Sequence, residues 1–147
     1  MFSGFTEEMI TFFLGLRCNN NRAYFEENRA VYERAIREPL IALTEALAET
    51  VLSIDPQLDT RPARTVSRIH RDIRFSHDQS PYRDYMWIGY RRAGEAREET
   101  CGFYFDISAE AAHWGCGFYQ ENRPAMERLR ARMNSAPQQV EGIVTEP

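Results

Sequence analysis

The densest concentration of chemically useful side chains lies between residues 68 and 83, where basic, acidic, imidazole and hydroxyl groups alternate. If the first part of this stretch is extended, side chains two residues apart share one face, which would bring together Arg68, His70, Asp72 and Arg74. Guanidinium groups are planar forks that bind carboxylate or phosphate in pairs, and crowded like charges repel unless an anion lies among them. The pattern therefore predicts either an anion site or an arginine–aspartate network that braces a turn.

The second part of the stretch, residues 76–82, has the composition of a polar turn. Asp78 can accept hydrogen bonds from backbone N–H groups, and Pro81 restricts the backbone at the exit. Ser76, His77 and Asp78 are also the residue types of a catalytic triad, but neighbours in sequence point apart, whereas a triad is assembled from distant positions. If there is catalysis at this turn, His77 and Asp78 are the acid–base candidates.

A second polar group lies upstream, at residues that recur with spacings of three and four: Asn21, Phe25, Asn28 and Tyr32. This spacing places them on one stripe of a helix. Two amides and a phenol beside an aromatic ring could recognise a ligand by hydrogen bonds. The same groups could instead cap the helix and pack it against a sheet.

The sequence gives little support for a metal site or a phosphate-binding loop. His113 and Cys116, with Cys101, are possible zinc ligands, but strand alternation sends His113 and Cys116 to opposite faces. The sequence has no paired Cys-x-x-Cys, no Gly-rich phosphate loop and no His-Glu-x-x-His. We therefore predict no metal and no cofactor.

The elements that must position these groups form an α+β pattern, with helices first and strands later. Apolar residues at helical spacing predict a first helix that begins near Thr6, followed by helices over 22–37 and 39–54 and a last helix over 124–133. β-Branched and aromatic residues predict strands over 65–75, 82–91, 101–108 and 113–119. We expect N-terminal helices packed on a mostly antiparallel sheet, then a C-terminal helix, in one domain over residues 1–147.

The two later strands have the clearest pattern, because apolar and polar residues alternate with a period of two. The inward set is expected to be Cys101, Phe103, Phe105, Ile107, Trp114, Cys116 and Phe118. The other face carries side chains that could supplement acid–base chemistry or could simply be solvated, namely Tyr104, Asp106, His113 and Tyr119.

Composition excludes several classes of protein. The 147 residues are 43% hydrophobic and 27% charged, as in a folded domain, and no apolar run is long enough to cross a membrane. Three scattered cysteines favour a reducing cytoplasm over a disulfide scaffold. All 18 basic residues are arginine, and residues 61–92 hold eight of them against three aspartates, a net charge of +5 within a chain of −4. This balance favours a small local anion and disfavours nucleic acid.

The central stretch resembles a known family pattern in the residues Arg68-Ile69-x-Arg71-Asp72-x-Arg74-Phe75-Ser76-x-Asp78-x-Ser80-Pro81-Tyr82. A second match covers residues 2–5 and 20–39, and a weaker one covers Gly117 and the helix after it. Together they are similar to the DUF2461 family, conserved hypothetical proteins of bacteria and fungi. Since that family has no established activity, the resemblance implies a fold and candidate sites but no reaction.

The chain departs from the family pattern in ways that bear on an anion site. The family usually has lysines where this chain has His77, Gln79 and Arg83, and a tryptophan at Tyr24. Relatives also tend to run further, so we expect a C-terminal segment of theirs to be missing after residue 147. A site completed by that segment would be incomplete.

Our first hypothesis is a small phosphate- or carboxylate-bearing ligand bound between the 68–83 segment and the helix over 20–32. The expected ligand-binding residues are Arg68, Arg71, Asp72, Arg74, Ser76, Tyr82, Arg83, Asn21, Asn28 and Tyr32. The alternative is a non-enzymatic structural or protein-interaction module, in which the arginines only brace the fold and the partner contacts are Trp87, Tyr90 and Tyr119. Nucleic-acid binding ranks last, because acidic flanks oppose it.

Overall fold

The computed structural model describes residues 1–74, 77–96 and 100–145. Its centre is a three-stranded antiparallel sheet in the order β1-β2-β3, with β1 at Tyr85–Tyr90, β2 at Cys101–Ser108 and β3 at Ala112–Phe118. The α-helices of the described residues are α1 (Glu7–Cys18), α2 (Arg22–Glu27), α3 (Arg29–Tyr32), α4 (Glu38–Ile54), α5 (Pro62–Thr65), α6 (Arg123–Ser135) and α7 (Pro137–Thr145). This arrangement confirms the predicted α+β class, with N-terminal helices, an antiparallel sheet and C-terminal helices.

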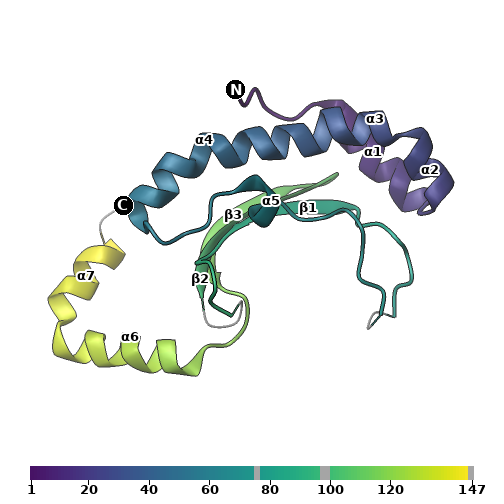
Figure 1. The fold of residues 1–147 in the computed structure, drawn as a ribbon. Coiled ribbons are helices and arrows are strands. Elements are labelled where there is room, and N and C mark those ends of the chain that lie inside the picture. Colours follow the sequence, from purple (N-terminus) through teal and green to yellow (C-terminus); the bar gives the residue numbers. More distant parts are fainter. Residues whose placement is uncertain (75–76, 97–99, 146–147) are drawn as a thin grey trace.

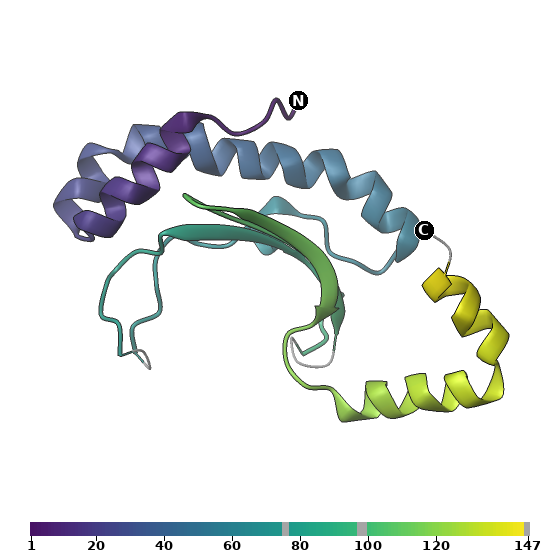
Figure 2. The ribbon, with the colours of Figure 1, turned by 180° about the vertical axis from the view of Figure 1, so that it is seen from behind.

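The helices are distributed unevenly about the sheet. Figures 1 and 2 show α4 lying along one side of the curved sheet, with α1 to α3 at one end of the same side, while the opposite side faces away from these helices. Helices α6 and α7 bury no residue and lead away from the sheet. None of the helices in the described part of the chain is both long enough and apolar enough to span a bilayer. One face of the sheet is thus packed, and the other is open.

Helix α1 forms where the sequence predicts the first helix. Its first turn carries Glu7 and Glu8 and its last turn Arg17, which complement the helix dipole. The buried positions follow the helical spacing of three and four: Met9, Phe12, Phe13 and Leu16. The apolar residues Ile10 and Leu14 of the same helix are exposed.

The predicted helix over 22–37 is divided rather than continuous. Helix α2 ends at Glu27, and the side-chain amide of the following Asn28 donates a hydrogen bond to the carbonyl of Tyr24 (2.9 Å). Helix α3 then runs into one π-helical turn, Glu33–Arg37, before α4 begins with Pro39 in its first turn. Because proline lacks an N–H and suits a first turn, the irregular turn lies where a regular ladder would be interrupted.

The core lies between α1, α4 and the packed face of the sheet. Met86, Ile88 and Tyr90 of β1 are buried there, and the Tyr90 hydroxyl donates a hydrogen bond to the carbonyl of Thr44 in α4 (3.1 Å). The expectation that Tyr90 contacts a protein partner is therefore wrong, because its ring is only 2% exposed. Trp114 pairs with Phe105 on the same face but is 77% exposed, since β3 is the edge strand beyond the helices.

The predicted strand over 65–75 is not a regular strand in its described part. The segment and the chain before it follow the free edge of β1 through three isolated bridges, Leu58 to Arg92, Val66 to Ile88 and His70 to Tyr82. Helix α5 lies between the first two bridges and ends at Thr65, and Phe75 lies outside the described residues. Beyond the last bridge, the chain forms the loop that projects from the end of β1 in Figure 1.

Candidate functional site

The charged side chains of the projecting loop pair mainly with one another. The Arg71 guanidinium forms an ion pair with Asp78 (Nη1–Oδ2, 2.8 Å), and Arg74 forms one with Asp72 (Nη2–Oδ2, 2.6 Å). At the base of the loop, the Arg71 N–H donates to the carbonyl of Pro81 (2.9 Å). The loop therefore contains its own counter-charges.

Of the two predicted acid–base residues of the loop, Asp78 is held as a carboxylate. Asp78 accepts hydrogen bonds from Ser80, which, together with the charge of Arg71, hold the pKa of its carboxyl below the ordinary value. It is thus an ionised group at neutral pH. His77 is exposed, and the predicted ligand residue Ser76 lies outside the described residues.

Arg83 binds the backbone of the loop rather than facing an open site. Its Nη1 donates to the carbonyls of Arg68 (2.9 Å) and His70 (2.6 Å), and its guanidinium lies 5.0 Å from the ring centroid of Trp87. The Arg68 side chain is exposed and has no ion pair with a described residue, while Arg71 Nε is buried without a hydrogen-bond partner among them. Among the predicted ligand-binding arginines, the Arg68 side chain and the Arg71 Nε therefore have donors without a partner in the described part of the chain.

The polar stripe of the helical motif is directed into its own helices. Asn21 caps α2 by accepting a hydrogen bond from the Tyr24 N–H (3.0 Å), and Asn28 donates to the Tyr24 carbonyl. Tyr32 is 6% exposed beside Phe12 and Phe25, and burial raises the pKa of its phenol to about 12. These groups cap and pack the helices.

The helical motif and the loop do lie together, as predicted, but other residues join them. Asn20 donates to the Tyr82 carbonyl (2.9 Å) and accepts from the Tyr82 N–H (3.1 Å). The Phe25 ring stacks on the Tyr82 ring with centroids 4.4 Å apart. The predicted ligand residue Tyr82 is 4% exposed, so this junction is packed rather than hollow.

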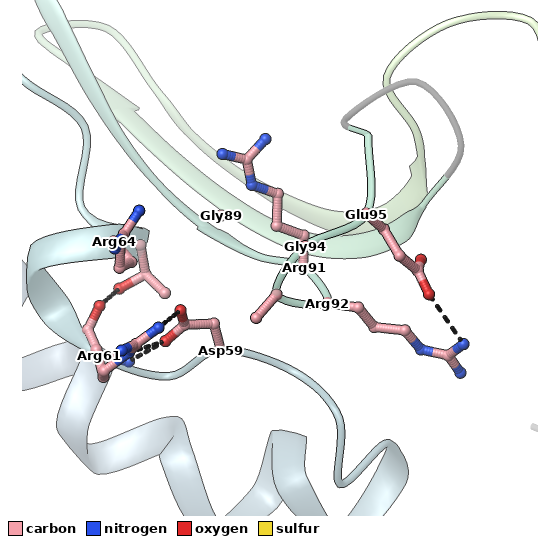
Figure 3. A pocket seen from close by; sticks show the side chains of 10 residues that line it. Asp59, Arg61, Arg64, Gly89, Arg91, Arg92, Gly94 and Glu95 are labelled. Atoms are coloured by element: carbon pink, nitrogen blue, oxygen red, sulfur yellow. Dashed lines mark hydrogen bonds and ion pairs between the residues drawn. The ribbon is translucent and has the colours of Figure 1, made fainter.

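A cavity lies elsewhere, at the other end of β1. It encloses about 190 Å³ and is formed by two segments, residues 59–65 and residues 89–95 (Figure 3). The segments are held together because the Asp59 N–H donates to the Arg91 carbonyl (2.9 Å) and Leu58 bridges Arg92. Its charged lining residues are Asp59, Arg61, Arg64, Arg91, Arg92 and Glu95. We call this hollow the arginine cavity.

The arginines of this cavity differ in their partners. Arg61 binds Asp59 through two atoms (2.8 and 2.5 Å), which lowers the pKa of that carboxyl to about 2. Arg92 pairs with Asp55 outside the lining and, at 3.6 Å, with Glu95. Arg64 and Arg91 form no ion pair and their side chains no hydrogen bond with any described residue.

The lining of the arginine cavity carries a surplus of positive charge. Four guanidinium groups stand against two carboxylates, a net charge of +2 in a protein whose total is −4. Figure 3 shows the side chains of Arg64 and Arg91 extending to the same side, with Gly89 between them. Gly89 adds no side chain, so the floor between the two arginines stays open.

On the open face of the sheet, Asp106 and His113 form the one acid–imidazole pair among the described residues (2.9 Å). No group of three or more described His, Cys, Asp or Glu side chains is placed to hold a metal ion. The three cysteines are free.

Comparison with protein families assigns residues 8–147, nearly the whole chain, to the model of the conserved hypothetical protein DUF2461. The chain belongs to the DUF2461 family. No curated protein and no solved structure matches it. The family resemblance of the central arginine stretch is thereby confirmed, while the description of DUF2461 names no ligand or reaction, so a function for this member must be argued from its own geometry.

Proposed function

We propose that this DUF2461 protein binds a small anion, phosphate or carboxylate, in the arginine cavity. The observation that carries the proposal is the pair Arg64 and Arg91, two guanidinium groups that line one hollow without a carboxylate partner. Elsewhere in the cavity, each positive charge is at least partly compensated, by Asp59 for Arg61 and by Asp55 for Arg92.

The physical reason is the repulsion between the cationic side chains. Guanidinium groups held near each other by the backbone repel unless an anion lies between them, and their forked donors match the oxygens of phosphate or carboxylate. The cavity, at about 190 Å³, is smaller than the ~300–1,000 Å³ of sites for drug-sized molecules, which favours a small group. The acidic remainder of the chain repels long polyanions, so a small anion fits better than nucleic acid.

For the projecting loop, the contacts favour the alternative role of a brace. Two arginines there pair with aspartates of the same loop, and a third, Arg83, holds two backbone carbonyls. We propose that this network fixes the loop, and that the anion is held in the arginine cavity rather than beside Arg68 and Arg71.

The direct test is calorimetric titration with inorganic phosphate. Arg91→Ala should abolish binding, because it removes an unpaired donor from the cavity. Arg22→Ala is the matched control, since Arg22 is 88% exposed on α2 and far from the cavity in sequence and fold. Binding that persists unchanged in Arg91→Ala, or is lost equally in Arg22→Ala, would refute the assignment.

A further inference from the structure

The four glycines in the strands of the sheet all lie on its open face. In β1, Met86, Ile88 and Tyr90 are buried under the helices, so Gly89 faces the other way. The register then places the remaining three on the same face as Gly89, because Gly89 pairs with Tyr104, Tyr104 with Gly115, and Gly102 with Gly117.

Two of these glycines are not required by the packing of the chain. A Cβ added at Gly117 would meet nothing within 4 Å, and one at Gly89 would meet only Trp87 Cδ1 at 3.9 Å. Gly102 differs, because a Cβ there would lie 2.4 Å from the Tyr90 carbonyl oxygen. Glycine in a strand weakens it, and commonly marks a place where a ligand or another backbone approaches closely.

The aromatic ring of Tyr104 lies over the fourth glycine. A Cβ at Gly115 would be 3.1–3.3 Å from three atoms of the Tyr104 ring and hydroxyl, so the absent side chain is what lets the ring lie down on β3. Tyr104 is nevertheless 46% exposed. One face of the ring covers the sheet, and the other is available for stacking.

The backbone of Tyr104 is one strand away from the arginine cavity, although its ring lies toward β3. Gly89 both lines the cavity and is the direct partner of Tyr104 across β1 and β2. A Cβ at Gly102 would lie 3.7 Å from the Cβ of Arg91, so Arg91 is diagonal to Tyr104 on the same face. Diagonal neighbours on antiparallel strands are about 7–8 Å apart. Asp106 and His113 lie on the same face of the sheet, on the side of Tyr104 away from Arg91.

We propose that the anion bound in the arginine cavity is one end of a ligand whose other end is a flat ring. This ring stacks on Tyr104, on the sheet face that carries the four strand glycines. This inference rests on the proposed function and adds the class of ligand. The separation of Tyr104 and Arg91 suits a ring joined to a phosphate or carboxylate by a short linker. An aryl phosphate and a nucleoside monophosphate share this chemistry, and base–aromatic stacking tolerates any flat ring.

The experiment compares affinities for inorganic phosphate, ribose 5-phosphate, phenyl phosphate and AMP by calorimetry. Phenyl phosphate and AMP should bind more tightly than the two ligands without an aromatic ring. In Tyr104→Ala, the ratio of AMP affinity to phosphate affinity should fall by roughly 5- to 150-fold, the loss expected for one stack. Tyr104→Phe should retain the ratio.

Two further variants separate stacking from a general loss of structure. Gly117→Val adds bulk to the glycine-bearing face of the sheet at a position with free space for a Cβ, and should lower the same ratio. Tyr85→Ala is the matched control, because Tyr85 is 41% exposed on the same face but lies six residues before Arg91. It should leave the ratio unchanged.

The outcomes distinguish this inference from the one on which it rests. If phosphate binds in an Arg91-dependent manner but AMP and phenyl phosphate bind no more tightly than phosphate, the stacked-ring proposal is overturned and the anion site is retained. If ribose 5-phosphate and AMP both bind more tightly than phosphate, and by the same factor, the added affinity comes from the sugar and the stacked-ring proposal is also overturned. No binding of any of the four ligands would overturn both proposals.

Discussion

Asn20 and Tyr82, 62 residues apart in the chain, satisfy each other through two hydrogen bonds, one in each direction between the Asn20 amide and the Tyr82 backbone (2.9 and 3.1 Å). The stacked rings of Phe25 and Tyr82 extend this junction into the core. Through it, the start of α2 and the end of the projecting loop form one structural unit. The family motifs around these residues are therefore explained at least partly by architecture.

Replacement of Asn20 tests this junction. Asn20→Ala leaves the partly buried N–H and carbonyl of Tyr82 without partners, and should lower the free energy of unfolding by about 1–3 kcal/mol in urea denaturation. Asn19→Ala is the control, because Asn19 is exposed and the hydrogen bond of its side-chain amide is a long one, 3.4 Å to the carbonyl of Gly15. Equal stability of the two variants would show that the junction contributes nothing.

We expect the arginines of the loop to differ in how much they contribute to the free energy of unfolding. Arg83→Ala removes two hydrogen bonds to loop carbonyls and the contact with Trp87, and should cost about 1 kcal/mol of unfolding free energy. Arg68→Ala should change stability by less than about 0.5 kcal/mol, since that side chain is exposed and unpaired among the described residues. A greater loss in Arg68→Ala than in Arg83→Ala would contradict the proposed brace.

The pH dependence of stability should report the Asp59–Arg61 pair. The pKa of the Asp59 carboxyl is lowered to about 2, so its stabilising contribution is complete above the ordinary value of 3.8 and is lost as the pH falls towards 2. Asp59→Asn should therefore be less stable than the wild type near neutral pH, and the two stabilities should converge between pH 3.8 and about 2. A difference that grows as the pH falls would have the wrong sign for this pair.

Steric filling of the arginine cavity should block phosphate without unfolding the chain. In Gly89→Val, the new Cβ finds only Trp87 Cδ1 at 3.9 Å, and valine suits a strand, so thermal stability should be retained while phosphate binding is lost. Ala112→Val places the same side chain at an exposed position of β3, and should bind phosphate like the wild type. Normal phosphate affinity in Gly89→Val would show that the space over Gly89 is not part of the phosphate site.

Local patterns were sufficient to predict much of the fold. The period-two alternation identified β2 with the bounds 101–108 and β3 to within one residue, because side chains alternate between the two faces of a strand, although β3 buries none of its residues. The segment over 65–75 has strand-like composition but not the ladder of a strand. It pairs with the β1 edge only through the isolated bridges at Val66 and His70, and this irregular pairing depends on tertiary contacts that composition does not encode.

Local sequence patterns, in contrast, did not predict the arginine cavity. The arginines that line the cavity come from two segments about thirty residues apart, and neither segment has a motif of its own. They meet because the Asp59 N–H binds the Arg91 carbonyl beside β1, a contact that spacing in sequence cannot reveal. The one available signal was the net charge of +5 over residues 61–92, which includes all four of these arginines. The conspicuous motif, by contrast, supplies its own counter-charges.

The most direct measurement is a thermal-shift comparison of the wild type, Arg91→Ala and Arg71→Ala against phosphate, AMP and small carboxylates. A ligand at 100 times its Kd should stabilise the wild type by about 2.7 kcal/mol, which is several degrees for a chain of this size. We predict that Arg91→Ala keeps the melting temperature of the ligand-free protein but loses the shift, whereas Arg71→Ala keeps the shift. A shift that survives in Arg91→Ala and disappears in Arg71→Ala would place the anion in the projecting loop and contradict the assignment to the arginine cavity.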